Sequence, residues 1–297
     1  MNKNFNVFIV GGGNRLNTCI PVFLKYKLNL YGIFISKNEN KKLIKKILIK
    51  EKIKIFQEWN SFLRSVNKKS NSIVFFISHN KLIDPKIFLS ARLINYHASP
   101  LPKYRGGSPM NWALINNEKE FGVSIHELVK SPDTGAILMQ EHFCIQDLDY
   151  LKLVDRVNEA FLRLSKILLN SFELHWINRI PQDERLASYF HQRKPENSAV
   201  NFVSMDANFI HRMFIALPKP LPRPFFIFRN KTYIISSCKI PKVNYSGTPG
   251  RVIGNFEGGV VIVCKSGSIV LEKLFNENLK KENYAKKFLK TGDQLSD

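Results

Sequence analysis

The sequence predicts an α/β domain with a mainly parallel sheet, followed by a small OB-like β-barrel domain. In the first half, short apolar runs alternate with segments whose apolar residues have helical spacing, which is the pattern of βαβ units. After residue 204 a short helical segment is followed by five short strands within about 50 residues, separated by turns such as EGG, and this suits a small barrel. We therefore expect a first domain in residues 1–185, a linker in 186–204 and a second domain in 205–297.

Five apolar runs bounded by turn residues predict the strands of the first sheet, at residues 6–10, 30–36, 52–56, 72–78 and 92–98. Helices are expected at 14–27 and 41–50 between them, and the clearest helix at 150–178. The helix at 150–178 has one apolar stripe formed by Val154, Val157, Phe161, Leu164 and Leu168. The polar, proline-containing stretch 181–202 is expected to cross between the domains, and 206–216 to be helical.

Charge and cysteine content narrow the class of protein. The chain of 297 residues has 45 Lys and Arg against 24 Asp and Glu, for a net charge of +21. Such a balance favours nucleic acid or phosphate as a partner, but most of the cations are lysines that accompany many Ile and Asn, as expected from an AT-biased codon supply. The four cysteines form no CxxC pair, which argues for buried thiols in a reducing cytoplasm and against a metal site or disulfides. We expect a cytoplasmic protein, because no membrane span or leader is evident.

The stretch NYHASPLPKYRGG, residues 95–107, places Asn95 and His97 on one face of a strand end. Pro100 and Pro102 stop the strand pairing, so these side chains lie where the sheet opens to solvent. An amide can donate to a developing oxyanion, and an imidazole can move a proton near neutral pH. Taken alone, the pair also fits a strand end whose polar groups satisfy nearby backbone.

Two further motifs are weaker by themselves. Asp133 lies in the turn KSPDTG between two predicted strands, where an aspartate commonly caps its own loop. The glycines Gly11, Gly12 and Gly13 follow the first strand without the GxGxxG spacing or the acidic ribose partner of a dinucleotide site, so a nicotinamide cofactor is disfavoured. The other histidines, at positions 126, 142, 175, 191 and 211, have no ligand spacing and are interpreted as structural or solvated, and the Lys-rich stretch 37–54 as a solvated helix face.

In combination, NYHASPLPKYRG, the strand GVSIHELV and the turn SPDTGAILMQ resemble 10-formyltetrahydrofolate-dependent formyltransferases. Asp133 stands 36 residues after His97, as in that family. The likeness is greatest to enzymes that formylate nucleotide-linked amino sugars, in particular the formyltransferase domain acting on UDP-4-amino-4-deoxy-L-arabinose, and it continues through QRKPENSAVNF and IHRMFIALPKPLPRPFF. The GGG turn and LPRPFF depart from the relatives, which leaves the sugar-side pocket and the exact substrate open. The sequence also does not name the nucleotide carrier, UDP or dTDP, or the oligomeric state.

The resemblance implies a Rossmann-like first domain, an OB-like second domain and a role in making lipopolysaccharide, lipid A or O-antigen sugars. By position, Asn95, His97 and Asp133 would be catalytic, with no metal. Folate would bind along two segments, namely Lys81, Leu82 and Ile83, and Val129, Lys130, Ser131, Pro132 and Asp133. The acceptor side would comprise Gly11, Gly12, Gly13, Ser99, Tyr104, Arg105 and Gly106.

Two other functions compete with this interpretation. Methionyl-tRNA formyltransferases share the chemistry and would use the positive charge, but the segment after the second strand lacks their Pro/Gly/Arg-rich loop. A non-catalytic nucleic-acid-binding module would need aromatic stacking platforms on the barrel. Phe225, Phe226, Phe228 and Tyr233 could serve there, but they fit core strands equally well.

Overall fold

The computed structural model describes residues 5–26, 29–35, 48–79 and 81–295. These residues form two compact units. The first comprises the described residues of Met1–Pro109, Glu120–Ile145 and Leu153–Phe190, and the second those of Met110–Lys119, Gln146–Lys152 and His191–Asp297. Most of the expected helix 41–50 and the start of the Lys-rich stretch lie outside the described residues, although residues 48–50 are helical.

A seven-stranded sheet forms the centre of the first unit, in the order β3-β2-β1-β4-β5-β7-β8. The first five strands are parallel: β1 (Asn6–Gly11), β2 (Asn29–Ile35), β3 (Lys54–Phe56), β4 (Ser72–Ile77) and β5 (Arg92–His97). Next to them, β7 (Glu120–Glu127) runs antiparallel to β5, and β8 (Ile137–Cys144) runs antiparallel to β7. The predicted α/β class with a mainly parallel sheet is confirmed.

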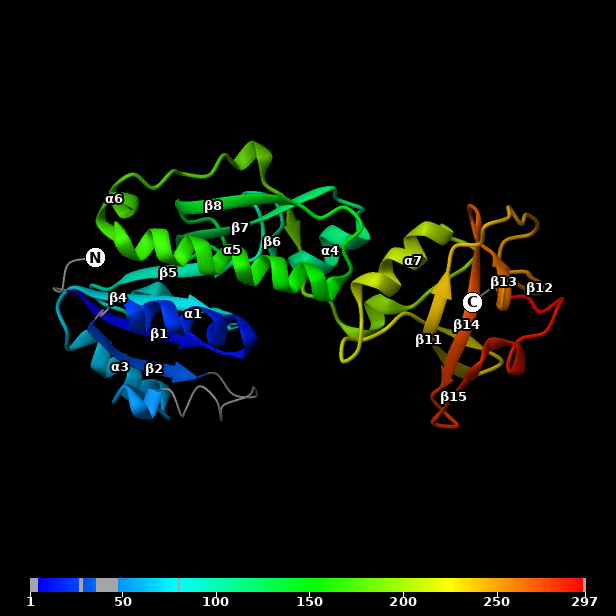
Figure 1. The fold of residues 1–297 in the computed structure, drawn as a ribbon, viewed down its shortest axis with the longest axis horizontal. Helices are drawn as coiled ribbons and strands as arrows, with labels where there is room; N and C mark the ends of the chain where they lie inside the picture. Colours follow the sequence, from blue (N-terminus) through cyan, green and yellow to red (C-terminus); the bar gives the residue numbers. More distant parts are fainter. Residues whose placement is uncertain (1–4, 27–28, 36–47, 80, 296–297) are drawn as a thin grey trace. The chain divides into compact units, whose positions relative to one another are not determined.

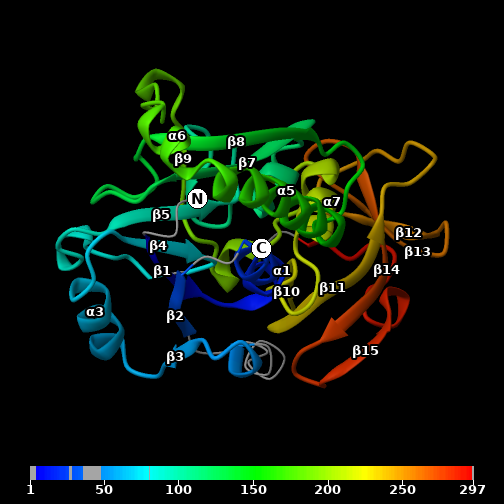
Figure 2. The same ribbon diagram turned by 60° about the vertical axis from the view of Figure 1, so that its left-hand side comes forward.

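Helices cover both faces of this sheet (Figures 1 and 2). On one face, α1 (Gly13–Lys25) packs Phe23 edge-on against Phe75 of β4, with ring centroids 5.0 Å apart. On the other face, α3 (Trp59–Asn67) buries Phe62 in a cluster that includes Phe76. Phe75 and Phe76 are adjacent in β4 and point to opposite faces, so each apolar strand needs a helix on both sides.

The helix predicted at 150–178 is two helices, α5 (Tyr150–Asn170) and α6 (Phe172–Ile177). Ser171 separates them with a φ of −135° and a ψ of 45°, outside the helical region. In α5 the buried stripe contains Val157, Phe161, Leu164 and Leu168 as predicted, while Leu153 is buried in place of Val154. Phe161 packs on Tyr96 of β5 with ring centroids 5.2 Å apart, which places α5 on the same face as α1.

The second unit contains an antiparallel sheet formed by β10 (Phe225–Phe228), β11 (Lys231–Lys239), β12 (Val252–Phe256), β13 (Gly259–Val263), β14 (Ser268–Asn276) and β15 (Lys281–Tyr284). β13 and β15 pair with successive halves of one edge of β14, so the sheet curls. The helices α4 (Pro109–Ile115) and α7 (Ala207–Ala216) belong largely to this unit. Phe226 and Tyr233 are buried in its core, and Phe228 packs against that core. Phe226 and Tyr233 are therefore core residues, whereas Phe225 and Phe228 are half-buried.

The short elements are β6 (Arg105–Gly106), β9 (Tyr189–Phe190) and the 3-10 turns η1 (Pro85–Ile87), η2 (Glu184–Leu186), η3 (Pro195–Ser198) and η4 (Ala285–Lys287). β6 and β9 pair in parallel, so residues 189–190 of the predicted linker belong to the first unit. Within the described residues, no helix combines the length and apolarity needed to cross a bilayer.

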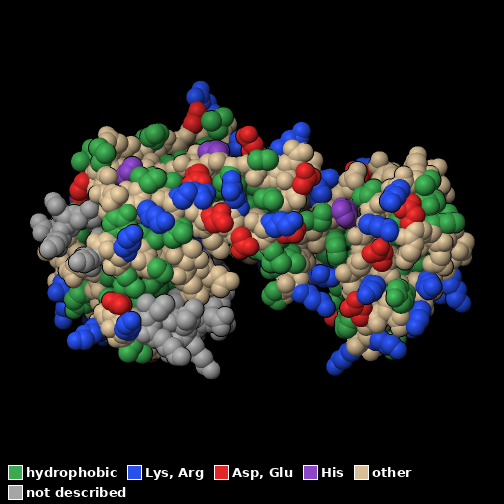
Figure 3. All heavy atoms as spheres, viewed as in Figure 1, with side chains coloured by type: hydrophobic (Ala, Val, Ile, Leu, Met, Phe, Trp, Pro, Cys, Tyr) green, Lys and Arg blue, Asp and Glu red, His purple; other side chains and the backbone are tan. Residues whose placement is uncertain are grey.

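The structure shows where the basic side chains lie and which of the four cysteines are buried. On the face of each unit drawn in Figure 3, lysine and arginine side chains are dispersed among acidic and neutral ones. Cys19, Cys238 and Cys264 are buried free thiols, as expected. Cys144, at the end of β8, is exposed, which corrects the expectation of burial for this residue.

Candidate active site

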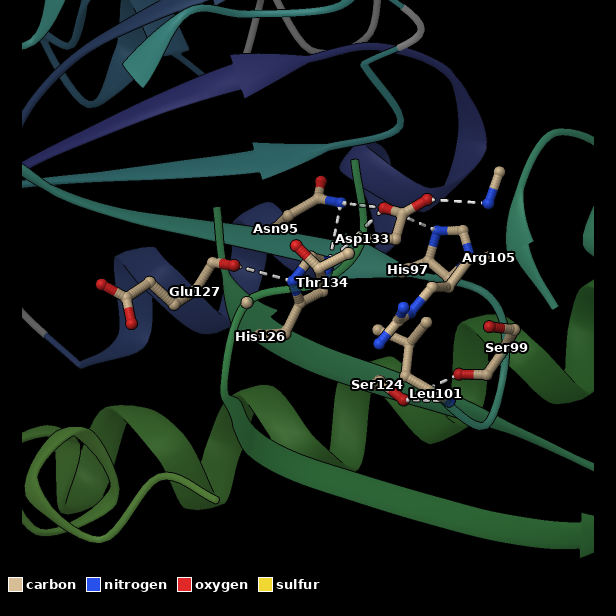
Figure 4. A network of polar contacts seen from close by, with 12 residues as sticks. Asn95, His97, Ser99, Leu101, Arg105, Ser124, His126, Glu127, Asp133 and Thr134 are labelled. Atoms are coloured by element: carbon tan, nitrogen blue, oxygen red, sulfur yellow. Dashed lines mark hydrogen bonds and ion pairs between the residues drawn. The ribbon is translucent and has the colours of Figure 1, made fainter. Parts of the chain in front are cut away.

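Asn95 and His97 lie at the carboxyl end of β5, the strand where the parallel part of the sheet meets the antiparallel part. They are two residues apart and point to the same face, toward Asp133 (Figure 4). Asn95 donates from Nδ2 to Oδ1 of Asp133 over 3.5 Å, and Nδ1 of His97 lies 3.4 Å from the same oxygen. Two of the three residues that the sequence indicated, Asn95 and His97, therefore converge on the carboxylate of the third, Asp133.

Asp133 reaches the site from the tight turn between β7 and β8. Its φ of 57° is in the left-handed region, which is unusual for a residue with a side chain. The turn must also pass close to β7, because a Cβ on Gly135 would lie 1.9 Å from the carbonyl oxygen of Glu127. At the other side, the backbone amide of Gly106 donates to Oδ2 of Asp133 over 2.9 Å. Both carboxylate oxygens are thus held in place.

The protonation state of His97 follows from its partners. Nε2 lies 3.0 Å from the carbonyl oxygen of Tyr104, which can only accept, so Nε2 carries the hydrogen. In the neutral ring the lone pair is then on Nδ1, facing Asp133. Burial lowers the pKa of His97, and the nearby carboxylate of Asp133 opposes that shift. His97 is therefore a neutral base whose basic nitrogen faces a carboxylate that can stabilise its protonated form.

Asp133 remains ionised in this environment. Burial raises its pKa, but the protonated forms of His126 and His97, through a hydrogen bond and a nearby charge, together with the Gly106 amide outweigh burial and lower the pKa to about 2. At neutral pH the carboxylate carries no proton to donate. Its chemical role is to orient and stabilise cationic or N–H groups around it.

His126 is a site residue, although the sequence pattern alone favours a structural or solvated role for it. His126 is only 1% exposed. Its Nε2 lies 3.1 Å from Nδ2 of Asn95 and 3.6 Å from Oδ1 of Asp133. Nδ1 lies 2.8 Å from the carbonyl oxygen of Glu127 and must donate to it, so Nε2 of the neutral ring accepts from Asn95. This contact arises because His126 faces Asn95 across the β5–β7 pairing, and no local signal in the sequence indicates it.

Arg105 is completely buried beside the site, and its guanidinium binds protein groups from one segment, 182–189. It donates to Oε1 of Gln182 from Nε and Nη2, at 3.1 and 2.8 Å, and to both carboxylate oxygens of Glu184 at 2.8 Å. The guanidinium also bonds to the hydroxyl of Tyr189 and stacks on its ring. The sequence predicts Arg105 on the acceptor side, and in the structure its buried side chain anchors the loop that follows β5.

Ser99, Tyr104 and Gly106 shape the same loop from within the protein. Ser99 is fully buried and donates to the carbonyl of Lys103, while its own carbonyl accepts from Ser124. The ring of Tyr104 is buried against Phe190, with centroids 4.6 Å apart. The side chains of Ser99 and Tyr104 do not face solvent, whereas Gly106 is exposed, and contact of these residues with the acceptor stays a prediction. They hold the Tyr104 carbonyl against His97 and the Gly106 amide against Asp133.

The glycines after β1 have a packing requirement of their own. A Cβ on Gly11 would lie 1.9 Å from the carbonyl oxygen of Ile77 in β4, and Gly12 donates its amide to that oxygen over 3.3 Å. Gly13 starts α1 with a φ of 70°. The close approach of β1 to β4 accounts for Gly11 without a ligand, and contact of the three glycines with the acceptor stays a prediction.

The two segments expected to bind folate are accessible. Leu82 is 84% exposed, Lys81, Lys130, Ser131 and Pro132 are exposed, and Ile83 and Val129 are half-buried. Within the described part of the chain, the backbone amides of Leu82, Ile83, Val129 and Lys130 donate no hydrogen bond. Free backbone donors flanked by apolar side chains suit a flat, polar-edged ring system such as the pterin of folate. No group of three or more His, Cys, Asp or Glu able to hold a metal ion is found among the described residues.

Comparison with protein-family models gives two matches. Residues 26–164 match the formyl transferase family model, and residues 193–292 match the model of the formyl transferase C-terminal domain. Among curated proteins, the chain is 34% identical over 233 residues to the bifunctional polymyxin resistance protein ArnA of Wigglesworthia glossinidia brevipalpis. That match covers 76% of this chain but 35% of the relative, so the chain spans about a third of the length of that protein.

Two solved structures share the fold at 21% identity, each with a TM-score of 0.71. One is the N-formyltransferase of Helicobacter canadensis in complex with folinic acid and dTDP-3-aminofucose, with 90% of this chain and 98% of that one covered. The other is WlaRD, a sugar 3N-formyl transferase studied with dTDP and 5-N-formyl-THF, with 93% and 99% covered.

Proposed function

The chain belongs to the formyl transferase family, and from this premise we propose that it is a folate-dependent sugar N-formyltransferase. It would move a formyl group from 10-formyltetrahydrofolate to the amine of a nucleotide-linked amino sugar. UDP-4-amino-4-deoxy-L-arabinose is the first acceptor to test, since the motifs around Asn95, His97 and Asp133 resemble those of the formyltransferase domain that acts on this sugar. The product would serve lipopolysaccharide or O-antigen sugar synthesis.

The observation that carries the proposal is the convergence of Asn95, His97 and Asp133 at the carboxyl end of β5. Formyl transfer to an amine needs a donor for the developing oxyanion and an acceptor for the proton that the amine loses. An amide N–H and a neutral imidazole within reach of one ionised carboxylate supply both. The carboxyl end of a parallel strand is also where ligands of such sheets bind.

In the proposed reaction, the amine nitrogen attacks the formyl carbon, and the carbonyl electron pair moves to the formyl oxygen. One hydrogen of Nδ2 of Asn95, which points to Asp133 at 3.5 Å, would donate to that oxygen. Nδ1 of His97 would take the proton from the attacking nitrogen. The bond between the formyl carbon and N10 of the folate then breaks, N10 receives the proton, and the formamide and tetrahydrofolate remain.

The hydrogen bond of His97 to Tyr104 explains why only Nδ1 can act as the base. When Nδ1 is protonated, the ring becomes a cation beside the carboxylate of Asp133, whose pKa of about 2 keeps it charged throughout. Asp133 thereby favours proton uptake at His97 without itself accepting the proton. The proposed role of Asp133 is electrostatic stabilisation and orientation.

The test is a mass-spectrometric assay with purified protein, 10-formyltetrahydrofolate and one acceptor at a time. The acceptors are UDP-4-amino-4-deoxy-L-arabinose, a dTDP-4-amino-4,6-dideoxyhexose, a dTDP-3-amino-3,6-dideoxyhexose and initiator Met-tRNA. We expect one formyl group on a nucleotide sugar, and none with the His97→Ala variant. Formylation of the tRNA alone would replace the sugar acceptor by tRNA and leave the chemistry intact. No product with any acceptor would contradict the proposed function.

A non-catalytic nucleic-acid-binding module is less consistent with the site. Of the four aromatic residues that could have stacked bases, Phe226 and Tyr233 are in the core of the second unit, and Phe225 and Phe228 are half-buried. A protein that only bound nucleic acid would also have no use for a desolvated carboxylate facing a neutral imidazole. Such binding would show as salt-sensitive association with tRNA without formyl transfer.

A further inference from the structure

Gln182 connects the two loops that build the site. It lies between Ile180, which bridges to Ile137 at the start of β8, and the 3-10 turn η2. Its Oε1 accepts from Nε and Nη2 of Arg105 at 3.1 and 2.8 Å. Its Nε2 donates to the carbonyl oxygens of Asp133 and Gly135 at 2.8 and 2.7 Å. One side-chain amide therefore makes four hydrogen bonds, two to each loop.

The turn that carries Asp133 needs such an external support. Asp133 has a left-handed φ of 57°, and its carboxylate is largely removed from solvent, both of which cost free energy. Inside the turn, the contacts that could hold it are those from Thr134 to the carbonyl of Ser131, at 3.5 Å for the amide and 3.0 Å for the hydroxyl. Ser131 and Pro132 are exposed. The two hydrogen bonds donated by Gln182 are shorter than these, and they hold the turn at the residues on both sides of Thr134.

We propose that Gln182 is a positioning residue for formyl transfer, which holds the Asp133 turn against the Arg105 loop. Through Arg105, the same amide is tied to the loop that presents the Tyr104 carbonyl to His97 and the Gly106 amide to Asp133. The distance between Asp133 and His97 is then set by Gln182 from outside the site. The catalytic part of this inference rests on the proposed function, whereas the positioning part is a property of the fold.

Gln182→Glu keeps the acceptor side of the Gln182 amide, which faces Arg105, and removes the donor side, which faces the Asp133 turn. A carboxylate keeps an acceptor for Arg105, so the buried guanidinium stays paired. It has no hydrogen to donate, so the carbonyl oxygens of Asp133 and Gly135 would face an oxygen instead of an N–H. Gln182→Met removes the amide without adding charge and serves as the second variant. Gln57→Glu, at an exposed position of the same unit, is the matched control for the change in charge.

Amide hydrogen exchange measures positioning without any assay of activity. The amide of Gly106 bonds to the Asp133 carboxylate, while that of Gly107 bonds to the carbonyl of Phe190 at 2.8 Å. We expect exchange at Gly106 to be at least ~10-fold faster in Gln182→Glu and Gln182→Met, with Gly107 unchanged and Gln57→Glu like the unmodified protein. Unchanged exchange at Gly106 would overturn the proposal, as would loss of the folded state in both Gln182 variants.

A double-mutant cycle with Asp133→Asn tests the catalytic part. If Gln182 acts through Asp133, Gln182→Glu lowers kcat by ~10- to 100-fold in the unmodified enzyme but by less than ~3-fold in the Asp133→Asn background. An equal loss in both backgrounds would mean that Gln182 does not act through Asp133. If no acceptor is formylated at all, the proposed function fails, and the exchange experiment still decides whether Gln182 holds the turn.

Discussion

Asn95 of β5 and His126 of β7 are directly paired residues of an antiparallel strand pair, and their side chains meet at 3.1 Å over the end of the sheet. Because Nδ1 of His126 donates to the Glu127 carbonyl, Nε2 can only accept in the neutral ring. The amide nitrogen of Asn95 is thus directed to His126 and Asp133, and its oxygen points away from them. A buried imidazole determines which way the proposed oxyanion donor faces.

This relationship predicts a catalytic defect at a residue that touches no substrate. In His126→Leu, Asn95 loses its acceptor and its amide can rotate, so we expect kcat to fall by ~10-fold or more, with a smaller effect on KM. His142→Leu on the neighbouring strand β8 is the control, since His142 is exposed. Equal kcat values for His126→Leu and the unmodified enzyme would show that Asn95 does not depend on His126.

Removal of either group proposed to act on the formyl transfer should nearly abolish turnover. Loss of one oxyanion donor typically costs about 3 kcal/mol in the barrier, which is roughly a hundredfold in rate. We expect at least that loss of kcat in Asn95→Ala and in His97→Ala, measured as single-turnover formyl transfer. Circular dichroism should show both variants folded, because each truncated side chain is at the carboxyl end of β5. A variant with the kcat of the unmodified enzyme would exclude that residue from the mechanism.

The pH dependence of His97 should change in a defined direction when Asp133 is neutralised. Burial lowers the pKa of His97 below its usual 6.5, and the Asp133 carboxylate opposes this shift by stabilising the imidazolium. Activity should therefore decline as pH falls through the lowered pKa of His97, because the base becomes protonated there. In Asp133→Asn the opposing charge is gone, so the midpoint of the His97 titration moves to lower pH.

NMR titration of the ring protons measures this shift even where turnover is too slow to assay. His211 of α7 provides an internal control, since burial lowers its pKa as well and it lies in the second unit. Its titration should not respond to Asp133→Asn. A His97 midpoint that stays constant or rises in the variant would mean that Asp133 does not stabilise the protonated ring.

The buried guanidinium of Arg105 should matter mainly for stability. A lysine at this position cannot donate to Gln182 and Glu184 at the same time, and it cannot stack on the ring of Tyr189. It therefore leaves polar groups unpaired next to a buried charge. We expect Arg105→Lys to lower the free energy of unfolding by about 3 kcal/mol, measured by urea denaturation. Arg185→Lys, at a highly exposed position nearby, should leave the midpoint unchanged. The same midpoint for both variants would contradict the anchoring role.

The sequence predicted well the features that depend on local pattern. Apolar runs ended by turn residues located β1, β2, β4 and β5 to within a residue or two, because strands buried on both faces contain few polar residues. The alternation of side chains in a strand also placed Asn95 and His97 on one face. Asp133 could be joined to them only through the family resemblance, since nothing local shows that a turn 36 residues away returns to the same point.

The parts that were missed depend on contacts between distant segments. His126 reaches Asn95 only through the register of β7 on β5, which a single strand does not specify. Gln182 lies in a polar, proline-containing stretch that was interpreted as a crossing between domains. Its significance is visible only once Arg105 and Asp133 are seen on either side of it. The break at Ser171 was missed because the apolar spacing of α5 runs on into α6.

The distribution of the four thiols provides separate reporters of unfolding for the two units. Burial raises the pKa of Cys19 to about 11, and of Cys238 and Cys264 to about 12, so these thiols do not react with alkylating reagents while they are folded. Cys19 belongs to the first unit, and Cys238 and Cys264 belong to the second. Once exposed Cys144 has been blocked, the labelling rate of each remaining cysteine measures how often its own unit opens, and this shows whether the two units unfold together or one at a time.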